Sequence, residues 1–509
     1  MFANKKMFVR KKKNKSGVIS VQVIDKSSGT YKVAHTVGSS ADKNEIDRMV
    51  TEAKRWITKQ TKLQEIDFTN YKAQMEQTLE GVDQLTIAGG ELLIGKLFDE
   101  IGFNKIDDLL FRQLVIGRLL YPASKLKTVD LLSKYQFMNI DVQKVYRYLD
   151  KLYNTQKDFV QQISYGHTLK ILGGKIQLVF YDVTTIYFEA ESEDELRKAG
   201  FSKDGKHSNP QILLGLLVGI GGYPLAYDIF EGNKFEGHTM LPVLEHFRIK
   251  YEVEQLVIIA DAGLLSKENI QLLEEKGYEY ILGAKIKTES EAIKRKIVSL
   301  TLNNGETSFI QKQGNTRLII SYSESRARKD AYNRERGLEK LHKQIKSGKL
   351  TKSHINNRGY NKFLEMKGNV NLQIDNDKIE ADKKWDGLKG YVTNTKLTNE
   401  EVIENYKQLW QIEKAFRVSK TDLKIRPIYH RVQRRIEAHI CISFVAYKIY
   451  KELERQLNEK KSNLSPEKAI NIAKTIFAIK IVHPISNDEI SKTLIITEEQ
   501  KILAQLFNF

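Results

Sequence analysis

Short apolar runs between residues 175 and 285 alternate with stretches in which hydrophobic positions recur every three or four residues. Runs rich in Val, Ile, Leu and Phe predict buried strands, and the longer period predicts helices. Strands are expected at 176–181, 211–220, 223–230, 256–260 and 278–283, and helices at about 238–250 and 266–276. The resulting order of strand, strand, strand, helix, strand, helix, strand matches a ribonuclease H-like core of the α/β class.

The pattern changes on both sides of this core. Three short strands separated by Gly-containing turns precede a helix, which predicts a small β unit at the start of the chain. The predicted parts are 1–65 as the three-stranded β unit with its helix, 90–170 as a helical bundle, 171–285 and 390–455 as the ribonuclease H-like core, 286–389 as a β-rich insertion with a basic helix, and 456–509 as a helical tail.

An excess of basic residues indicates the kind of partner that the protein binds. The 509 residues include 82 Lys and Arg against 64 Asp and Glu, which gives a formal net charge of +18. Such a charge favours a polyanionic partner such as DNA, because neutralising phosphates releases counterions. The β unit and the helical bundle are both candidate DNA-binding domains, although a solvated Lys-rich hairpin and a purely structural bundle are nearly as good interpretations.

Two further features of the composition point to the compartment. Cys441 is the only cysteine, so an intrachain disulfide is excluded and a reducing compartment is expected. The longest apolar stretch, Ile212–Ile220, is much shorter than the roughly 20 residues that a membrane-spanning helix needs. We expect a protein of the bacterial cytoplasm, associated with the nucleoid and with no membrane partner.

Three acidic residues occupy positions that favour metal chemistry. Asp182 follows the apolar run 176–181, Asp261 follows the run 256–260, and Glu413 lies on a long helix expected to begin near Asn399. Acids at strand ends lie at the mouth of a sheet, where ligands collect in open α/β folds. Because Mg²⁺ prefers oxygen ligands, and two such ions can activate the attacking oxygen and stabilise the leaving one, the three acids are candidate catalytic and metal-binding residues for cutting phosphodiesters.

The spacing on the expected helix supports Glu413. Tyr406, Glu413 and Lys420 are seven residues apart, close to two helical turns each, and Arg417 joins the same face. A carboxylate flanked by cations fits a DNA backbone that runs along the helix. Each acid alone has an ordinary interpretation, since an Asp after a buried strand is often a turn or cap residue and a Glu among lysines is usually a surface ion pair. Their joint order favours the catalytic interpretation.

At these motifs the chain resembles the DDE transposases of bacterial insertion sequences, in the group whose helix carries a Tyr-x2-Arg-x3-Glu-x6-Lys signature. Here the signature reads Tyr406-x2-Leu409-x3-Glu413-x6-Lys420, and the family's two aspartates correspond to Asp182 and Asp261. The resemblance covers about residues 95–455. It implies cut-and-paste DNA transposition in which the three acids bind two Mg²⁺ ions, for which Mn²⁺ can substitute, with cleavage at the transposon ends and strand transfer into target DNA.

The resemblance also implies partners and DNA contacts. The partners are double-stranded DNA, as terminal inverted repeats and target, and a second copy of the chain in a homodimer or larger synaptic complex. Tyr406 and Lys420 inherit DNA contacts by position. The signature's Arg is replaced by Leu409, so a phosphate contact is missing there, and Lys407 or Arg417 could supply it.

One aromatic residue and two other functions remain open. Trp410 could stack on an unpaired base, although an ordinary packing role is commoner for tryptophan. One alternative function is a metal-dependent phosphatase or nuclease on a Rossmann-like fold with Asp182 as nucleophile, although Thr184 stands where a phosphatase motif has a second Asp. The other alternative is a non-catalytic DNA-binding protein, which explains the charge but not the acids.

Overall fold

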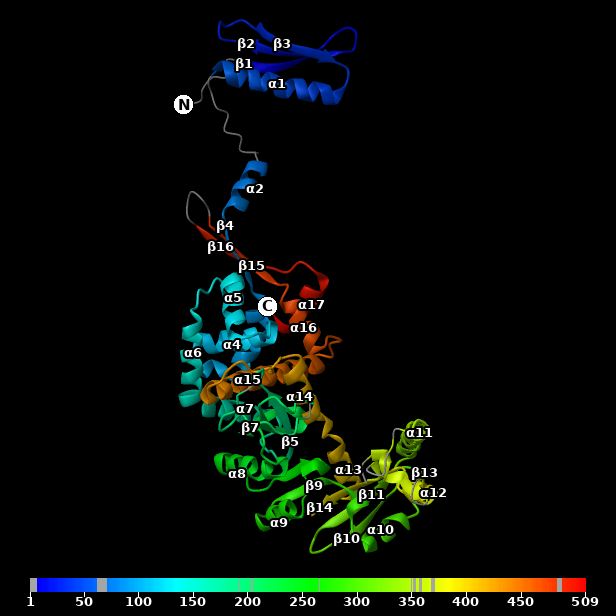
Figure 1. Ribbon diagram of the computed structural model, residues 1–509. Coiled ribbons are helices and arrows are strands. Elements are labelled where there is room, and N and C mark those ends of the chain that lie inside the picture. The colour runs from blue at the N-terminus through cyan, green and yellow to red at the C-terminus, as the bar shows by residue number, and fades with distance from the viewer. Residues whose placement is uncertain are drawn as a thin grey trace. The chain divides into compact units, whose positions relative to one another are not determined.

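The computed structural model divides into two compact units, one of residues 1–82 and 481–489 and one of residues 83–480 and 490–509. The residues that the structure describes are 7–61, 71–190, 192–202, 205–264, 266–348, 350, 354–356, 359–367, 371–482 and 488–509. Figure 1 labels the helices and strands of both units.

The smaller unit contains an antiparallel sheet and a helix. Its strands are β1 (Met7–Lys13), β2 (Ile19–Asp25) and β3 (Lys32–Ser40), in the order β1-β2-β3. Alternate residues of β2, Val21 and Val23, face Ile46 and Ala53 of α1 (Lys43–Thr61) and form a small core. The three strands and the helix lie where the pattern predicts them. A second helix, α2 (Tyr71–Glu80), follows.

A large mixed sheet forms the centre of the larger unit. Its strand order is β10-β11-β14-β9-β8-β5-β6-β7. The strands are β5 (Leu178–Tyr187), β6 (Gln211–Gly219), β7 (Pro224–Glu231), β8 (Val257–Ala260), β9 (Glu279–Ala284), β10 (Thr307–Gln311), β11 (Arg317–Tyr322) and β14 (Leu388–Thr393). β5, β8 and β9 are parallel to one another, and the other neighbours are antiparallel.

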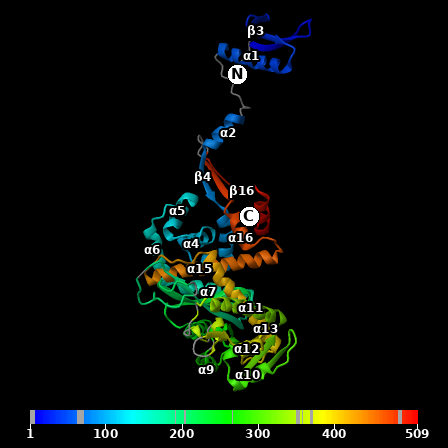
Figure 2. The same ribbon diagram turned by 45° about the vertical axis from the view of Figure 1, so that its right-hand side comes forward.

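Helices bury both faces of this sheet, which explains why its central strands are almost continuously apolar. Phe180, Ile259 and Ile281 belong to a core shared with the helical bundle and with α13 (Asn399–Lys407), α14 (Trp410–Thr421) and α15 (Gln433–Glu459). The residues next to them along each strand, among them Tyr181 and Ala260, face α8 (Met240–Tyr251) and α9 (Lys267–Glu275) on the opposite face. The sheet therefore has a bundle face and an outer face, visible in two views (Figures 1 and 2).

The helices before the sheet follow one another with short connections. They are the π-helical turn Gly90–Gly95, α3 (Lys96–Ile101), α4 (Leu109–Leu120), α5 (Lys125–Gln136), α6 (Val142–Lys151) and α7 (Lys157–Ile171). Among the described residues, none of the helices has the length and apolar character required to cross a bilayer.

The segment predicted as an insertion, residues 286–389, contains both strands and helices. β10 and β11 pair with β14 and extend the central sheet, because their alternating apolar residues continue its two cores. Before these strands lies α10 (Glu291–Val298). After them come α11 (Glu324–Lys346), the hairpin β12–β13 (Leu364–Lys367, Asn371–Ile374) and α12 (Asn376–Lys383). Two strands of the expected insertion therefore belong to the central sheet, and the assignment of residues 286–389 as a β-rich insertion with a basic helix stays a prediction.

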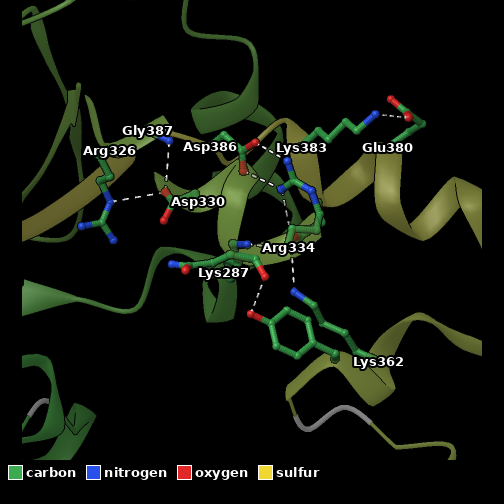
Figure 3. Close-up of polar contacts among 12 residues, drawn as sticks. Lys287, Arg326, Asp330, Arg334, Lys362, Glu380, Lys383, Asp386 and Gly387 are labelled. Atoms are coloured by element: carbon green, nitrogen blue, oxygen red, sulfur yellow. Dashed lines mark hydrogen bonds and ion pairs between the residues drawn. The ribbon is translucent and has the colours of Figure 1, made fainter. Parts of the chain in front are cut away.

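Ion pairs attach α11 to the chain that enters β14. Arg334 of α11 donates to both carboxylate oxygens of Asp386 at 2.7 and 2.5 Å, and Arg326 lies 3.6 Å from Asp330 (Figure 3). The backbone N–H of Gly387 donates to Asp330 at 3.2 Å. Arg334 is almost fully buried, and its pairing with Asp386 connects α11 to the chain just before β14.

The predicted helical tail is also only partly helical. α15 runs to Glu459, and α16 (Pro466–Ala473) and α17 (Glu498–Phe507) follow it. Between them, β15 (Phe477–Val482) and β16 (Glu489–Leu494) form a sheet in the order β16-β15-β4, in which β4 spans Val82–Ile87. β16 pairs with its neighbour β15, whereas β15 also pairs with β4, which lies far away in the sequence and gives no local signal.

Candidate active site

The register of two parallel strands brings Asp182 and Asp261 side by side. β5 and β8 pair from Leu178↔Val257 to Tyr181↔Ala260, so the two aspartates occupy the next position on each chain. Neighbouring strands lie about 4.8 Å apart. β8 ends at Ala260, whereas β5 continues past Asp182 and remains paired with β6. The expectation that Asp182 ends its strand is therefore wrong, but both acids lie where the parallel pairing ends.

Asp182 lies on the bundle face of the sheet. Phe180 belongs to the core on that face, and side chains two residues apart on a strand share a face. α14, which carries Glu413, contacts β5 and belongs to the same core. Asp182 is half-buried, whereas Asp261 and Glu413 are exposed. Three acids from three separate segments thus converge on one face.

Asp261 is held in place by two donors. Its Oδ1 accepts a hydrogen bond from the N–H of Ala262 at 2.7 Å and another from the hydroxyl of Tyr406 at 3.2 Å. Burial raises the pKa of Tyr406, and the charge of Asp261 adds to that rise, so the phenol stays protonated and remains a donor.

The position of Tyr406 depends on a glycine and on a second tyrosine. A β-carbon at Gly283 of β9 would lie 2.4 Å from the Tyr406 hydroxyl, so only glycine leaves that hydroxyl its place. The ring of Tyr406 packs edge-on against that of Tyr391, with 4.9 Å between ring centroids. Tyr406 is 6% exposed and acts from inside the core.

The single helix expected from Asn399 is broken. α13 ends at Lys407 and α14 begins at Trp410, and the turn between them is tightened by i→i+3 hydrogen bonds such as Leu409 N–H to Tyr406 C=O at 3.0 Å. Tyr406 and Glu413 are therefore not on one straight stripe, since the first is buried and the second exposed. The predicted spacing argument holds only within α14.

The remaining predicted DNA contacts lie on or beside α14. Glu413, Arg417 and Lys420 keep their helical spacing, and Arg417 is exposed while Lys420 is half-buried. Trp410 is 54% exposed, with the ammonium of Lys414 5.8 Å from its ring centroid.

Two positions near the start of α14, the candidate phosphate contact Lys407 and the signature position Leu409, have different surroundings. Lys407 is exposed and lies 3.4 Å from Glu404. Leu409 is 7% exposed within the core, so its side chain cannot reach a phosphate.

Sequence reasoning missed Lys389, a half-buried cation of β14 beside the acids. Its Nζ lies 4.6 Å from the ring centroid of Tyr406 and 5.2 Å from that of Tyr391. Burial lowers the pKa of Lys389, the charge of Arg326 lowers it further, and the charges of Asp261 and Glu413 oppose both effects. A lysine in the run Leu388–Gly390 has no local signal of this role, because the acids come from distant segments.

A basic cleft opens next to Lys389. Its volume is about 550 Å³. The acids of its wall, Asp330, Asp382 and Asp386, are engaged in ion pairs, several of which Figure 3 shows. The basic residues that line it are Lys285, Lys287, Arg326, Arg334, Lys362 and Lys389.

The three acids supply the right donors for a divalent metal but do not enclose one in this arrangement. Carboxylate oxygens suit Mg²⁺ and Mn²⁺, and the exposure of Asp261 and Glu413 leaves room for the waters that Mg²⁺ keeps. Within the described ranges, no three His, Cys, Asp or Glu side chains come close enough together to hold an ion. The donor set fits, and closing it requires side-chain movement.

Comparisons with known proteins place this geometry in a family. Residues 173–449, more than half of the chain, match the family described as transposase DDE domain. No curated protein sequence matches the chain.

Two solved structures are similar at low identity. One is a piggyBac transposase synaptic complex with hairpin DNA, at 8% identity over 76% of this chain and 78% of that chain, with a TM-score of 0.38. The other is a Mos1 transposase paired-end complex with the left transposon end, at 10% identity over 37% of this chain and 57% of that chain, with a TM-score of 0.16. By its family match, the chain belongs to the transposase DDE domain family and is a DNA-cleaving and strand-transferring enzyme.

Proposed function

We propose that this transposase performs cut-and-paste DNA transposition with Asp182, Asp261 and Glu413 as its catalytic carboxylates. The observation that carries the proposal is the register of β5 and β8, which sets the two aspartates side by side beneath the helix that bears Glu413. Family membership favours this chemistry over a phosphatase or a non-catalytic DNA-binding protein.

The proposed fold of the catalytic core is ribonuclease H-like. The sheet order β7-β6-β5-β8-β9 supports it, with an antiparallel β5–β7 meander followed by two parallel strands that are each preceded by a helix. In this arrangement the acids lie where the parallel strands end, as ligand sites of open α/β sheets do.

The three carboxylates would hold two Mg²⁺ ions, or Mn²⁺ in their place. The ions supply activation of the attacking oxygen and stabilisation of the leaving oxygen. Tyr406 orients Asp261 through its hydrogen bond, and Lys389 offsets the mutual repulsion of Asp261 and Glu413 while no ion is bound. The exposure of Asp261 and Glu413 leaves this face open to a DNA strand.

The proposed substrate is double-stranded DNA, as terminal inverted repeats and as target, bound by a homodimer or larger synaptic complex in the bacterial cytoplasm at the nucleoid. The net charge of +18 supports a polyanionic partner. Arg417, Lys420, Lys407 and Trp410 are the proposed DNA contacts around α14. Tyr406, which is buried, acts on Asp261 rather than on the DNA backbone.

One assay tests the function directly. The full chain is incubated with Mg²⁺ and DNA that carries the inverted repeats flanking its own gene, and cleavage at the repeat ends is measured. Asp182→Asn, Asp261→Asn and Glu413→Gln should each lower cleavage by about 10³-fold or more, because each removes a metal ligand. Glu404→Gln, an exposed acid of α13, is the matched control and should cleave normally. Cleavage that survives all three changes would contradict the proposed site.

A further inference from the structure

Four basic side chains gather in the helical part of the larger unit. Arg118 of α4 is 3% exposed, Lys125 at the start of α5 is 4% exposed, and His439 of α15 is 6% exposed. His430 lies in the segment between α14 and α15, with its ring centroid 5.6 Å from that of His439. We call Arg118, Lys125, His430 and His439 the basic cluster.

Among the residues that the structure describes, no acid forms an ion pair with Arg118 or Lys125. Burial alone lowers the pKa of Arg118, to about 10, so its guanidinium stays charged at neutral pH. Burial and the charge of Arg118 hold the pKa of Lys125 well below its usual range, and no carboxylate opposes that shift. The neighbouring acid, Asp150, acts on His430 but is already bound by Arg434 and Arg435, at 2.8 and 2.9 Å.

Polar groups in the basic cluster are also poorly satisfied. Arg118 Nη1 donates to the carbonyls of Leu423 and Lys424 at 3.4 Å each, a long distance for a charged donor. His439 Nε2 lies 3.0 Å from the carbonyl oxygen of Ile425, whereas its Nδ1 is buried with no hydrogen-bond partner.

A helix terminus adds to the positive potential. Lys125 is the first residue of α5, a helix of 12 residues whose N-cap is Ser124. The first turn of a helix presents free N–H groups and the positive end of the helix dipole. A buried charge without an acidic partner, such as that of Arg118, is costly, and strongly perturbed groups cluster at functional sites.

We propose that the basic cluster binds a phosphate group. The guanidinium of Arg118 would compensate its charge, Lys125 and His430 would donate hydrogen bonds to it, and the free N–H groups in the first turn of α5 would donate to its oxygens. The segment that contains His430 reaches the surface, since Tyr429 is 67% exposed and Arg431 and Arg434 are exposed as well. The phosphate chemistry is shared by a DNA backbone, a source that rests on the proposed function, and by free inorganic phosphate.

Replacing Lys125 distinguishes a role in the stability of the fold from a role in phosphate binding. A lysine that serves the fold would lower stability when it is replaced, whereas a lysine kept for an anion should raise stability when a neutral chain of similar length takes its place. We expect Lys125→Met to raise the Tm of the full chain in phosphate-free buffer by roughly 2 °C. Inorganic phosphate should raise the Tm of the unchanged protein and leave that of Lys125→Met unmoved.

The control and the DNA arm separate the sources. Lys127→Met, on the same helix at an exposed position, should keep the phosphate effect. For duplex DNA, the slope of log affinity against log salt should fall by about 1 in Lys125→Met if the ligand is a backbone phosphate. An unchanged slope with a lost phosphate effect identifies free phosphate as the ligand and still supports the site.

Two outcomes overturn the proposal. One is a Lys125→Met protein that is less stable than the unchanged chain or that fails to fold, because that result assigns Lys125 to the fold. The other is a variant that keeps both the phosphate effect and the salt slope. His430→Phe, which retains a ring against Tyr146, gives a second measure and should also lose the phosphate effect. None of these readouts requires DNA cleavage, so they remain decisive if the proposed active site is wrong.

Discussion

The acids of the candidate active site and the basic cluster are both groups of like charge, yet the protein holds them in opposite surroundings. Asp261 and Glu413 are exposed, whereas Arg118 and Lys125 are almost completely buried. Water screens exposed charges, so the acids repel one another weakly while no metal is bound. The buried cations have no such screening. The acids therefore cost little stability without their ions, and the cations are the stronger indication that a ligand is missing.

The largest effect should come from placing a buried cation at the acidic face. Leu409→Arg restores the signature residue, but its side chain would enter a core in which Leu409 is 7% exposed. We expect a loss of about 3 kcal/mol in the free energy of unfolding, measured by urea denaturation, because a charge would be buried without a partner. Leu409→Met is the control and should cost under about 1.5 kcal/mol. A stable Leu409→Arg protein that cleaves DNA faster would contradict the conclusion that position 409 is buried and cannot accept a charge.

A smaller effect tests how rigidly the acids are held. Tyr406→Phe removes the hydroxyl that donates to Asp261 at 3.2 Å. Hydrogen bonds to charged groups contribute about 1.5–3 kcal/mol, so cleavage at saturating Mg²⁺ should fall about tenfold. Tyr391→Phe is the matched control, because its ring packs against that of Tyr406 in the same core. Equal cleavage by both variants would show that Asp261 needs no such support.

The smallest effect should come from the cation that already faces the acids. Lys389→Met removes a charge that opposes a metal ion at Asp261 and Glu413. A removal worth about 1 kcal/mol should lower the Mg²⁺ concentration for half-maximal cleavage about fivefold. Lys389→Arg should leave that concentration unchanged, as should Lys287→Met, whose ammonium is paired with Asp382 at 2.7 Å. A higher Mg²⁺ requirement in Lys389→Met would mean that Lys389 helps to bind the metal or the DNA.

The sequence allowed the central sheet and the two aspartates to be predicted because both depend on local pattern. Apolar runs mark β5 and β8, and an acid directly after each run falls at the same register. The straight helix through Tyr406 and Glu413 was wrong, because periodicity does not reveal a change from i→i+4 to i→i+3 bonds at Leu409. The catalytic roles of Asp182, Asp261 and Glu413 stay predictions, and so do the DNA contacts.

What the sequence could not give depends on contacts between distant segments. Lys389 lies among Asp261, from a strand far earlier in the chain, and Tyr406 and Glu413, from the two helices that follow β14. The basic cluster joins Arg118 and Lys125 to two histidines that follow them by about 300 residues in the sequence. The role of such basic residues depends on whether they are buried, and the identity of a polar residue in the sequence does not reveal its burial.

Gly283 shows how a site can depend on an atom that is absent. The space that its missing β-carbon leaves is filled by the Tyr406 hydroxyl, which in turn reaches Asp261. A survey of tolerated substitutions should therefore rank Gly283 with the acidic residues, although no atom of it would touch metal or DNA. Intolerance to mutation at this position would mean that no β-carbon can be accommodated there. A redesign of β9 therefore has to keep glycine at position 283 as its first requirement.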